Sequence, residues 1–381
     1  HADKRFILCK GRLMQATYMD TFDWCDQNKV PITEVKPPMS DMVRFNVYDS
    51  EGIIQDARCI GIVTVGTYHI KFKGCKLLVR GDDRDTIPMV ILTPDHKLLA
   101  SKISKVAGKW TSTPQHFWEQ PLNNGTVDLR NVETSKRVSM NIPITAMFTQ
   151  TQYWHWLVED LPLFSLMSNQ PILGQNLNGF ELETIQPFQR RWNYRMIEGP
   201  AVIDAPEIDI FTYPNDSFGK VNPWVYGTLT SAFITDKTVD ETFPKKIYIT
   251  RDDADCRRVV NEDDVMRVCA AHGVTKITLS DYSFTDKVKL FHNADWIIGP
   301  HGAGLVNTMF CRPGTKILEF MTSHWVGNEL GFVRFGNQAG VEWNTMICRD
   351  DHTRPPRGGK HKNADMVVDI DGLKRMFLYP L

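Results

Sequence analysis

The C-terminal part of the chain alternates short apolar runs with segments of helical periodicity. The apolar runs are Lys245–Thr250, Val274–Leu279, Trp296–Gly299 and Lys316–Phe320, and each predicts a buried strand. Between them, apolar residues recur every three or four positions, which predicts helices. Strands that alternate with helices at this spacing are typical of parallel βαβ units. We therefore predict an α/β fold whose C-terminal half is Rossmann-like.

The helices of this half have boundary signals of their own. Asn261 and Ser283 each precede a periodic segment and are followed three residues later by an Asp, as in an N-terminal capping pattern. Gly273 predicts the end of the first of these helices. A final helix, Gly372–Leu378, is predicted to close the chain.

The first 150 residues have short β-type runs divided by turns. The clearest runs are Arg58–Tyr68, Cys75–Arg80 and Pro88–Leu92. Residues 151–200 are predicted to be helical, with a second helical segment around Phe188–Met196. The stretch Pro214–Pro244 has little periodicity, so we place a domain boundary there. The prediction is an N-terminal α/β domain of residues 1–235 and a C-terminal domain of residues 236–381.

Composition excludes several classes of protein. Of the 381 residues, 42% are hydrophobic and 23% are charged, which excludes disorder of the whole chain. The net charge is −1, so no global field attracts nucleic acid or acidic membranes, and any anion site must be local. We expect no membrane span, because no uncharged run has the roughly 20 apolar residues of a membrane helix. The start lacks Met and an apolar signal core, which indicates a tag junction or a truncation. The compartment stays open between the cytoplasm and the Golgi or ER lumen.

Cysteines and acidic runs do not indicate a metal site. The eight cysteines include no C-x-x-C pair, although those of the N-terminal quarter leave one or two disulfides possible. The runs Asp82–Asp85, Asp252–Asp255 and Asp369–Asp371 superficially match the acidic D-x-D of metal-dependent sugar transfer. None follows a convincing strand of an N-terminal nucleotide domain, so we interpret them as solvated turns and predict no metal dependence. Asn215-Asp216-Ser217 is one of two glycosylation sequons.

A glycine-rich turn is the strongest candidate for chemistry. Gly299-Pro300-His301-Gly302-Ala303-Gly304 lies between a predicted strand and a predicted helix. Small residues let the backbone approach a ligand, and free amides at a helix start favour a phosphate. Glu319 follows at the carboxyl end of the next strand, where an acid can hold ribose hydroxyls. Together they indicate a nucleotide site, and the alternative is a turn that only packs its helix on the sheet.

Three arginines lie near the same edge of the predicted sheet. Arg251 follows the first strand, and Arg257 and Arg258 follow a short acidic loop. Arginines placed there can hold a diphosphate bidentately and stabilise it as it leaves. The alternative is a set of surface ion pairs with the neighbouring aspartates, which contribute little.

A candidate general base lies in the N-terminal half. His155 and Glu159 are four residues apart and so share one helical face, where a carboxylate and an imidazole can tune each other. A histidine among aromatic residues can equally be structural. Asp160 lies off that face and is an alternative base.

These motifs together resemble glycosyltransferase family 61, whose members include plant xylosyltransferases and protein N-acetylglucosaminyltransferases. The residues that carry the resemblance are His155-Trp156-Leu157-Val158-Glu159-Asp160-Leu161-Pro162, Tyr248-Ile249-Thr250-Arg251, Arg257-Arg258, Gly299-Pro300-His301-Gly302-Ala303-Gly304-Leu305, Asn307, Pro313-Gly314-Thr315 and Glu319. The likeness runs from about residue 135 to residue 350.

The resemblance implies a GT-B architecture, with two Rossmann-like domains facing a cleft, inversion at the anomeric carbon and no required metal or other cofactor. It implies transfer of xylose or GlcNAc from a UDP-sugar to a glycan or glycoprotein hydroxyl. By this resemblance Glu159 is the base, which His155 orients, with Asp160 as the alternative. The resemblance also implies that the donor is held by Arg251, Arg257, Arg258, His301, Gly302, Ala303, Gly304, Asn307 and Glu319.

Two other functions remain open from the sequence. A nicotinamide-dependent oxidoreductase also uses a strand, a glycine loop, a helix and an acid, but the pattern here is G-x-x-G-x-G rather than G-x-G-x-x-G. An inactive nucleotide-binding relative is the other alternative, and the intact His155 and Glu159 pair argues against it.

Overall fold

The structure is a computed structural model, and it divides the chain into two compact units. It describes residues 15–79, 89–99, 126–128, 136–147, 152–174, 177, 179–189, 194–197, 201–215, 219–235, 238–322, 324, 330–356, 358 and 360–378. Unit 1 comprises His1–Pro37 and Gly66–Asp216, and unit 2 comprises Pro38–Val65 and Ser217–Leu381. The chain therefore passes between the units three times. This division does not coincide with a single boundary near residue 235, because an early segment belongs to unit 2.

Unit 1 contains two mixed sheets. The first has the order β10 (Lys136–Ser139), β14 (Ala201–Asp204), β6 (Lys76–Val79), β7 (Met89–Leu92), β8 (Lys97–Leu99), β1 (Gln15–Met19) and β9 (Thr126–Asp128). The second has the order β13 (Tyr194–Met196), β12 (Ile172–Gly174), β11 (Ile144–Ala146), β15 (Glu207–Phe211), β5 (Thr67–Lys73) and β2 (Ile32–Lys36). Side chains from both sheets, among them Phe72, Leu77, Ile203 and Ile210, form one buried core.

Unit 1 also has several helical segments. They are α1 (Thr21–Gln27), α4 (Tyr153–His155), a π-helical turn (Trp156–Asp160), a 3-10 helix (Leu161–Ser165), α5 (Phe180–Thr184) and α6 (Gln186–Gln189). Of the predicted helical stretch 151–200, residues 153–165 are helical, although not regular α-helix, whereas Ile172–Gly174 is strand β12. The predicted helical segment Phe188–Met196 is wrong at its C-terminal end, because Tyr194–Met196 is the edge strand β13 and pairs with β12.

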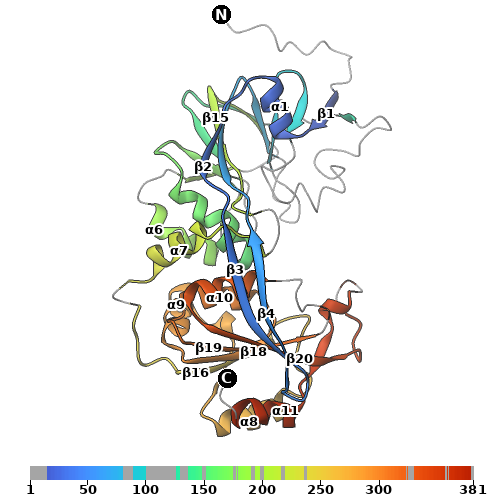
Figure 1. Cartoon of the computed structure of the whole chain (residues 1–381). Coiled ribbons are helices and arrows are strands. Elements are labelled where there is room, and N and C mark those ends of the chain that lie inside the picture. The colour runs from blue at the N-terminus through green and yellow to red at the C-terminus, as the bar shows by residue number, and fades with distance from the viewer. Residues whose placement is uncertain are drawn as a thin grey trace, which may run out of the picture. The chain divides into compact units, whose positions relative to one another are not determined.

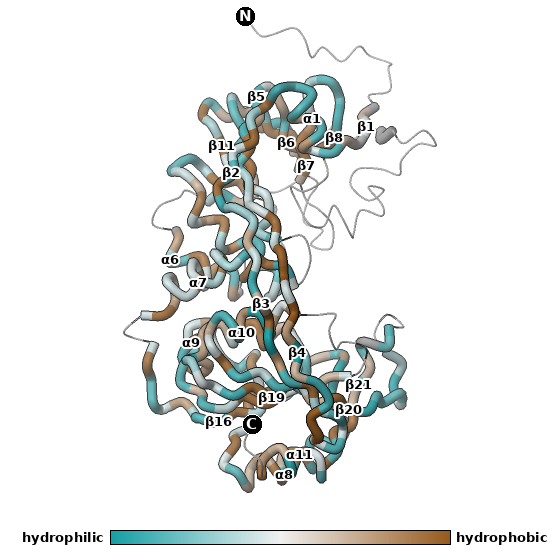
Figure 2. Tube along the Cα trace, viewed as in Figure 1, coloured by the Kyte–Doolittle hydropathy of each residue, from teal (hydrophilic) through white to brown (hydrophobic). Residues whose placement is uncertain are grey.

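Unit 2 is built on one mainly parallel sheet (Figure 1). Its order is β17 (Thr275–Ile277), β16 (Lys246–Ile249), β18 (Trp296–Pro300), β19 (Lys316–Thr322), β20 (Glu342–Asp351), β3 (Ser40–Tyr48) and β4 (Ile54–Val63), with β21 (Asp365–Val367) paired to β20. Every neighbouring pair from β17 to β3 is parallel. Strands β16 and β19 are largely hydrophobic (Figure 2), as expected for parallel strands buried on both faces. The predicted α/β fold with parallel βαβ units is confirmed.

The helices of unit 2 follow the predicted alternation, with two differences. They are α7 (Trp224–Phe233), α8 (Glu262–Ala271), a 3-10 turn (Leu279–Asp281), α9 (Phe284–Asn293), a 3-10 helix (Ala303–Phe310), α10 (Gly331–Ala339), a 3-10 turn (His361–Asn363) and α11 (Ile370–Leu378). Ser283 caps α9 as predicted, with its hydroxyl accepting from the Asp286 amide at 3.0 Å. Asn261 is the N-cap residue of α8, but its side chain pairs with the backbone of Val368 instead. Helix α7 lies in the stretch where the sequence shows little periodicity.

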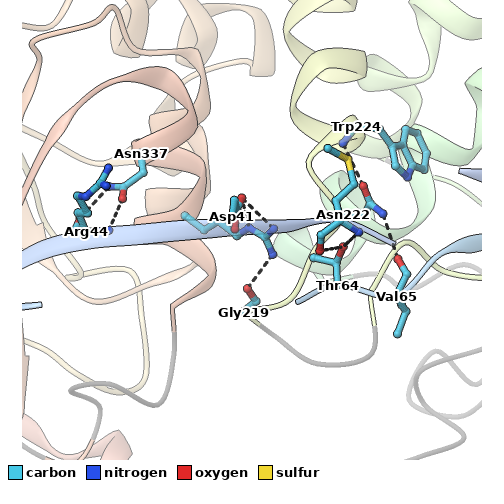
Figure 3. Close-up of polar contacts among 10 residues, drawn as sticks. Asp41, Arg44, Thr64, Val65, Gly219, Asn222, Trp224 and Asn337 are labelled. Atoms are coloured by element: carbon cyan, nitrogen blue, oxygen red, sulfur yellow. Dashed lines mark hydrogen bonds and ion pairs between the residues drawn. The ribbon is translucent and has the colours of Figure 1, made fainter. Parts of the chain in front are cut away.

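The β3–β4 hairpin is held in unit 2 by polar contacts beyond its strand pairing (Figure 3). Arg334 of α10 is 1% exposed, and its guanidinium bonds Asp41 at 2.9 and 3.1 Å and the Gly219 carbonyl at 3.3 Å. Asn337 pairs with both backbone groups of Arg44. The backbone amide of Met39 donates to the Thr64 hydroxyl, which joins the two ends of the hairpin segment. The side-chain amide of Asn222 donates to the Val65 carbonyl at the second of these ends. Residues next to all three crossings between the units are thus tied together inside unit 2.

Candidate functional site

The His155 and Glu159 pair of unit 1 lies where the helix changes from α to π geometry. Trp154, Leu157 and Val158 are buried and fix the helix in the core. The Trp156 indole donates to the Thr184 hydroxyl at 2.7 Å, which anchors the turn to α5. Single π-helical turns inside helices are frequent at functional sites.

Glu159 contacts a side chain through each carboxylate oxygen. Its Oε2 lies 2.9 Å from His155 Nδ1, and its Oε1 accepts from Asn215 Nδ2 at 2.7 Å. The Glu159 side chain is 0% exposed, whereas that of His155 is 26% exposed. The predicted His155 and Glu159 contact is therefore present, and the imidazole is the member that reaches solvent.

Asn215 was not predicted from the sequence as part of this site. It is 56 positions from Glu159 and drew attention only as a sequon. In the fold it is 4% exposed, and the amide nitrogen that a glycan would modify is bonded to Glu159. Local spacing carries no signal for such a contact.

Asp160 is buried as well, on a different side of the same turn. Burial raises the pKa of Tyr194 well above its usual value, and the charges of Asp160 and Glu181 raise it further. The charge of Asp160 thus acts on Tyr194 of the edge strand β13. The structure supports Asp160 less than Glu159 as a partner of the partly exposed His155.

The glycines of the predicted turn in unit 2 have three different neighbours. A Cβ at Gly299 would lie 2.8 Å from the Ile249 carbonyl oxygen, so this glycine allows β16 and β18 to pack. A Cβ at Gly304 would meet the Leu279 side chain. A Cβ at Gly302 would occupy the place of the Arg251 guanidinium. The packing alternative therefore explains Gly299 and Gly304, while Gly302 makes room for a cation.

Two arginines carry positive charge to this turn. Burial lowers the pKa of the Arg251 guanidinium to about 10, with the Arg257 charge as the second cause. Arg251 Nε donates to the Cys256 carbonyl at 3.1 Å, which fixes the side chain over the turn. Arg257 has a φ of 60°, a left-handed conformation that costs about 1–3 kcal/mol in a residue with a Cβ. Two guanidinium groups held close together are stabilised by an anion.

His301 lies in the same cluster and is bound to Glu319. Its Nδ1 is 2.6 Å from Glu319 Oε1, and both side chains are at most 2% exposed. Glu319 Oε2 accepts from the Trp343 indole at 3.1 Å and from the Thr345 hydroxyl at 3.4 Å. Burial lowers the pKa of His301, and the charges of Arg257 and Arg251 act in the same direction against that of Glu319. The Glu319 carboxylate thus points into the protein, where it orients His301 rather than facing a ribose.

The other predicted donor residues have distinct places. Arg258 is engaged by its own loop, with Nε donating to the Ala254 carbonyl at 2.6 Å and Nη2 to the Asp252 carbonyl at 3.1 Å. Asn307 is 0% exposed and donates to the Gly304 carbonyl at 2.8 Å inside its helix. Ala303 is exposed at the start of that helix. Structural roles therefore account for Arg258 and Asn307.

The acidic runs and the cysteines have different structural settings. Asp252 and Asp253 lie in an exposed turn and bind Lys276 and Ser280, each at 2.8 Å, while Asp82–Asp85 lie outside the described residues. No group of three or more His, Cys, Asp or Glu side chains in the described part of the chain can hold a metal ion. The seven cysteines that the structure describes are free, and Cys9 lies outside them. No described helix has the length and apolar character to cross a bilayer.

The fold and the two clusters define an α/β protein with a cationic turn in one unit and a His and Glu pair in the other. The family model of Glycosyltransferase 61 matches residues 153–318, which contain both of these features except Glu319. Residues 153–318 of the chain are thus similar to glycosyltransferase family 61.

Curated relatives match a limited part of the chain. The EGF domain-specific O-linked N-acetylglucosamine transferase of Bos taurus is 21% identical over 137 residues, which are 33% of this chain and 25% of the relative. The Mus musculus protein of the same name is 22% identical over 134 residues, with the same coverage. Protein O-linked-mannose beta-1,4-N-acetylglucosaminyltransferase 2 of Homo sapiens is 27% identical over 110 residues, which are 26% of this chain and 19% of the relative. The matches span a quarter or less of the length of these relatives.

Proposed function

We propose that the protein is an inverting, metal-independent glycosyltransferase that moves a sugar from a UDP-sugar to a hydroxyl of a glycan or glycoprotein. In this proposal the two units are the halves of a GT-B enzyme, with the acceptor bound by unit 1 and the nucleotide by unit 2. GlcNAc and xylose are the proposed sugars. The names of the curated relatives support GlcNAc, and the family resemblance supports both.

The observation that carries the proposal is the arginine pair at the Gly302 turn. Arg251 lies in the space that the missing Cβ of Gly302 leaves, and the Arg257 charge acts on it. A diphosphate that settles there replaces repulsion between the two guanidinium groups by charge-assisted hydrogen bonds. The same cations neutralise the charge that develops on UDP as it leaves. They thus supply the stabilisation that a divalent cation provides in other transferases.

The acid–base step falls to His155 and Glu159. The sequence alone favours Glu159 as the base, but its complete burial supports the reverse division of roles. His155 Nε2 accepts the proton of the acceptor hydroxyl while that oxygen bonds to C1 of the sugar and the bond from C1 to UDP breaks. The Glu159 carboxylate orients the imidazole through Nδ1 and stabilises the cation that forms. The proton ends on His155, and the electron pair leaves with UDP.

Binding of the nucleotide is tested first, by calorimetry and thermal shift with UDP, UDP-xylose, UDP-GlcNAc, GDP-mannose and NADH, each with and without EDTA. A ligand at 100 times its Kd contributes about 2.7 kcal/mol of stability, which thermal shift detects readily. We expect a response to UDP that survives EDTA. A response to NADH alone would instead support the oxidoreductase alternative, which the family match does not favour.

Turnover is then tested with the donor that binds. We expect His155→Ala to lower kcat about 10²- to 10⁴-fold with unchanged UDP affinity, and added imidazole to restore part of the rate. His69→Gln is the matched control, because His69 also pairs with a buried carboxylate of unit 1, that of Asp209, at 2.9 Å. Full activity of His155→Ala would overturn the role of the imidazole. UDP binding without turnover of any UDP-sugar would indicate the inactive relative.

A further inference from the structure

Asn215 lies at the end of a segment whose position is set by strand pairing. The segment follows β15, which pairs with β5 in an antiparallel register from Glu207 to Phe211. Just beyond the strand, Thr212 bonds Tyr68 twice: its amide donates to the Tyr68 carbonyl at 2.9 Å, and its hydroxyl accepts from the Tyr68 amide at 2.9 Å. Asn215 follows three residues later and is 4% exposed. Its side chain is therefore presented to Glu159 by the sheet and not by the helix that carries the base.

The chemistry of an amide makes this contact directional. The NH₂ group of Asn215 can only donate, so Glu159 Oε1 can only accept at 2.7 Å. A hydrogen bond donated to a carboxylate favours its ionised form. An ionised Glu159 then accepts from Nδ1–H of His155 through Oε2, which leaves Nε2 of the neutral imidazole as the lone pair that can take a proton.

Among the described residues, two sets of polar groups lie around this contact. His155 and Asn215 face the two oxygens of Glu159. Asp160 and Glu181 act on the buried Tyr194, and the two carboxylates raise the pKa of that phenol after burial does. Asn215 is thus the neutral donor in a region with three buried carboxylates, where a carboxylate in its place would add a fourth charge.

We propose that Asn215 is a positioning residue, which fixes the ionised Glu159 so that His155 presents its Nε2 to the acceptor hydroxyl. This inference rests on the proposed transferase function, since it gives Asn215 a role only through His155. Asn215 touches neither the sugar nor UDP in this account. Its removal is expected to change the chemical step and to leave donor binding unchanged.

The test compares Asn215→Ala, Asn215→Asp and Asn215→Ser in the full chain. For Asn215→Ala we expect kcat to fall about 10- to 150-fold, the size of a lost hydrogen bond to a charged group, while the donor KM and the UDP Kd stay within about twofold. The acid limb of its pH profile is expected to move to higher pH. Without the Asn215 donor, the negative charge of Glu159 interacts with the imidazolium of His155 alone and so stabilises it more. Asn215→Asp has the same shape without the donor, so its loss should be at least as large. Asn215→Ser keeps a small donor and should recover part of kcat.

The controls separate this inference from the function on which it rests. Asn293→Ala removes another buried asparagine, 2% exposed, whose amide donates to the Lys289 carbonyl at 2.8 Å in unit 2, and should leave kcat and the pH profile unchanged. Wild-type kcat and pH profile in Asn215→Ala would overturn the inference while the transferase function stands. Loss of UDP affinity in step with kcat would also overturn it, because a structural role predicts that. If Asn215→Ala does not fold, the Asn215→Ser variant is used for the test instead. A wild-type kcat with an unshifted pH profile of this variant would overturn the inference. A lowered kcat with a shifted acid limb would support it. Absence of any wild-type turnover with UDP-sugars would instead count against the proposed function.

Discussion

Substitution of Gly302 by Ala tests whether the arginine at the glycine turn is a ligand for UDP. The backbone of Gly302 is extended, with φ of −178°, so an alanine is tolerated there without strain. The added Cβ would lie 3.2 Å from Arg251 Cζ, and it would be closer to Nη1 than two such atoms can approach without a clash. The guanidinium is the far end of a flexible side chain, so it moves aside while the fold remains.

The size of the effect follows from that displacement. Nη1 must retreat by about 1.5 Å to reach an ordinary contact distance, which lengthens a hydrogen bond to a phosphate oxygen beyond its useful range. A hydrogen bond to a charged group contributes about 1.5–3 kcal/mol, so the Kd for UDP is expected to rise about 10- to 150-fold. The free energy of unfolding should change little, because alanine restricts the unfolded chain and so stabilises the fold by about 0.4–1 kcal/mol, which offsets the displaced contact.

Calorimetric titration with UDP measures the effect in a double-mutant cycle with Arg251→Ala. If Gly302→Ala acts only by displacing the guanidinium, the double variant should bind UDP as weakly as Arg251→Ala alone. Gly227→Ala is the matched control, since a Cβ there meets nothing within 4 Å, and it should bind UDP normally. Wild-type affinity of Gly302→Ala, or additive losses in the double variant, would refute the reasoning.

Three further predictions concern stability and reactivity. Asp41→Ala leaves the buried Arg334 without its carboxylate partner and should lower the free energy of unfolding, measured by chemical denaturation, by about 3 kcal/mol. The double variant Asp41→Ala/Arg334→Met should recover part of this loss. A wild-type denaturation midpoint for Asp41→Ala would contradict the prediction. Burial lowers the pKa of His301 below its ordinary value of 6.5, so the unfolded chain takes up that proton first, and stability is lost as pH falls below about 6.5. Between about pH 7.5 and pH 5.5 the melting temperature of His301→Gln should fall less than that of the wild type, and equal falls would contradict this. Cys59 is the exposed cysteine among the seven that the structure describes, whereas burial raises the pKa of Cys75 to about 12. Ellman's reagent with peptide mapping should therefore label Cys59 rapidly. Rapid labelling of the buried cysteines in the Cys59→Ser variant would contradict their burial.

Local patterns in the sequence sufficed for the elements of the C-terminal half. Strands β16, β18 and β19 and helix α9 form where apolar runs and a capping serine predict them, because each is stabilised by neighbours close in sequence or by its own periodicity. Helix α7 could not be recognised from periodicity, because its segment is rich in Pro, Gly and Thr, so its helical state depends on the fold around it. The same limit applies to the hairpin of β3 and β4, whose position in the parallel sheet depends on β20, nearly 300 residues away along the chain.

For the candidate site, the residue types and one local contact were predictable, but the partners that lie far away in the sequence were not. The contact of His155 with Glu159 follows from spacing on a helix, and it is present. The burial of Glu159 depends on the surrounding core, which periodicity at one helix does not show. Glu319 was predicted at the carboxyl end of its strand, but β19 continues to Thr322, so Glu319 lies in the middle of the strand. Its carboxylate points inward to Trp343 and Thr345 of the neighbouring strand β20. Asn215 reaches Glu159 only through the register of β15 and β5.

The early hairpin also constrains how the chain is made. Asp41 and its partner Arg334 are 293 residues apart, so at about 5–20 residues per second a ribosome needs about 15–60 s to deliver the second after the first. During that interval β3 has neither β20 nor the α10 helix to cover it. A nascent strand that waits so long exposes an edge on which other chains can pair. Unit 2 can therefore close only after α10 and β20 have left the ribosome, and not when the first domain-sized segment has been made.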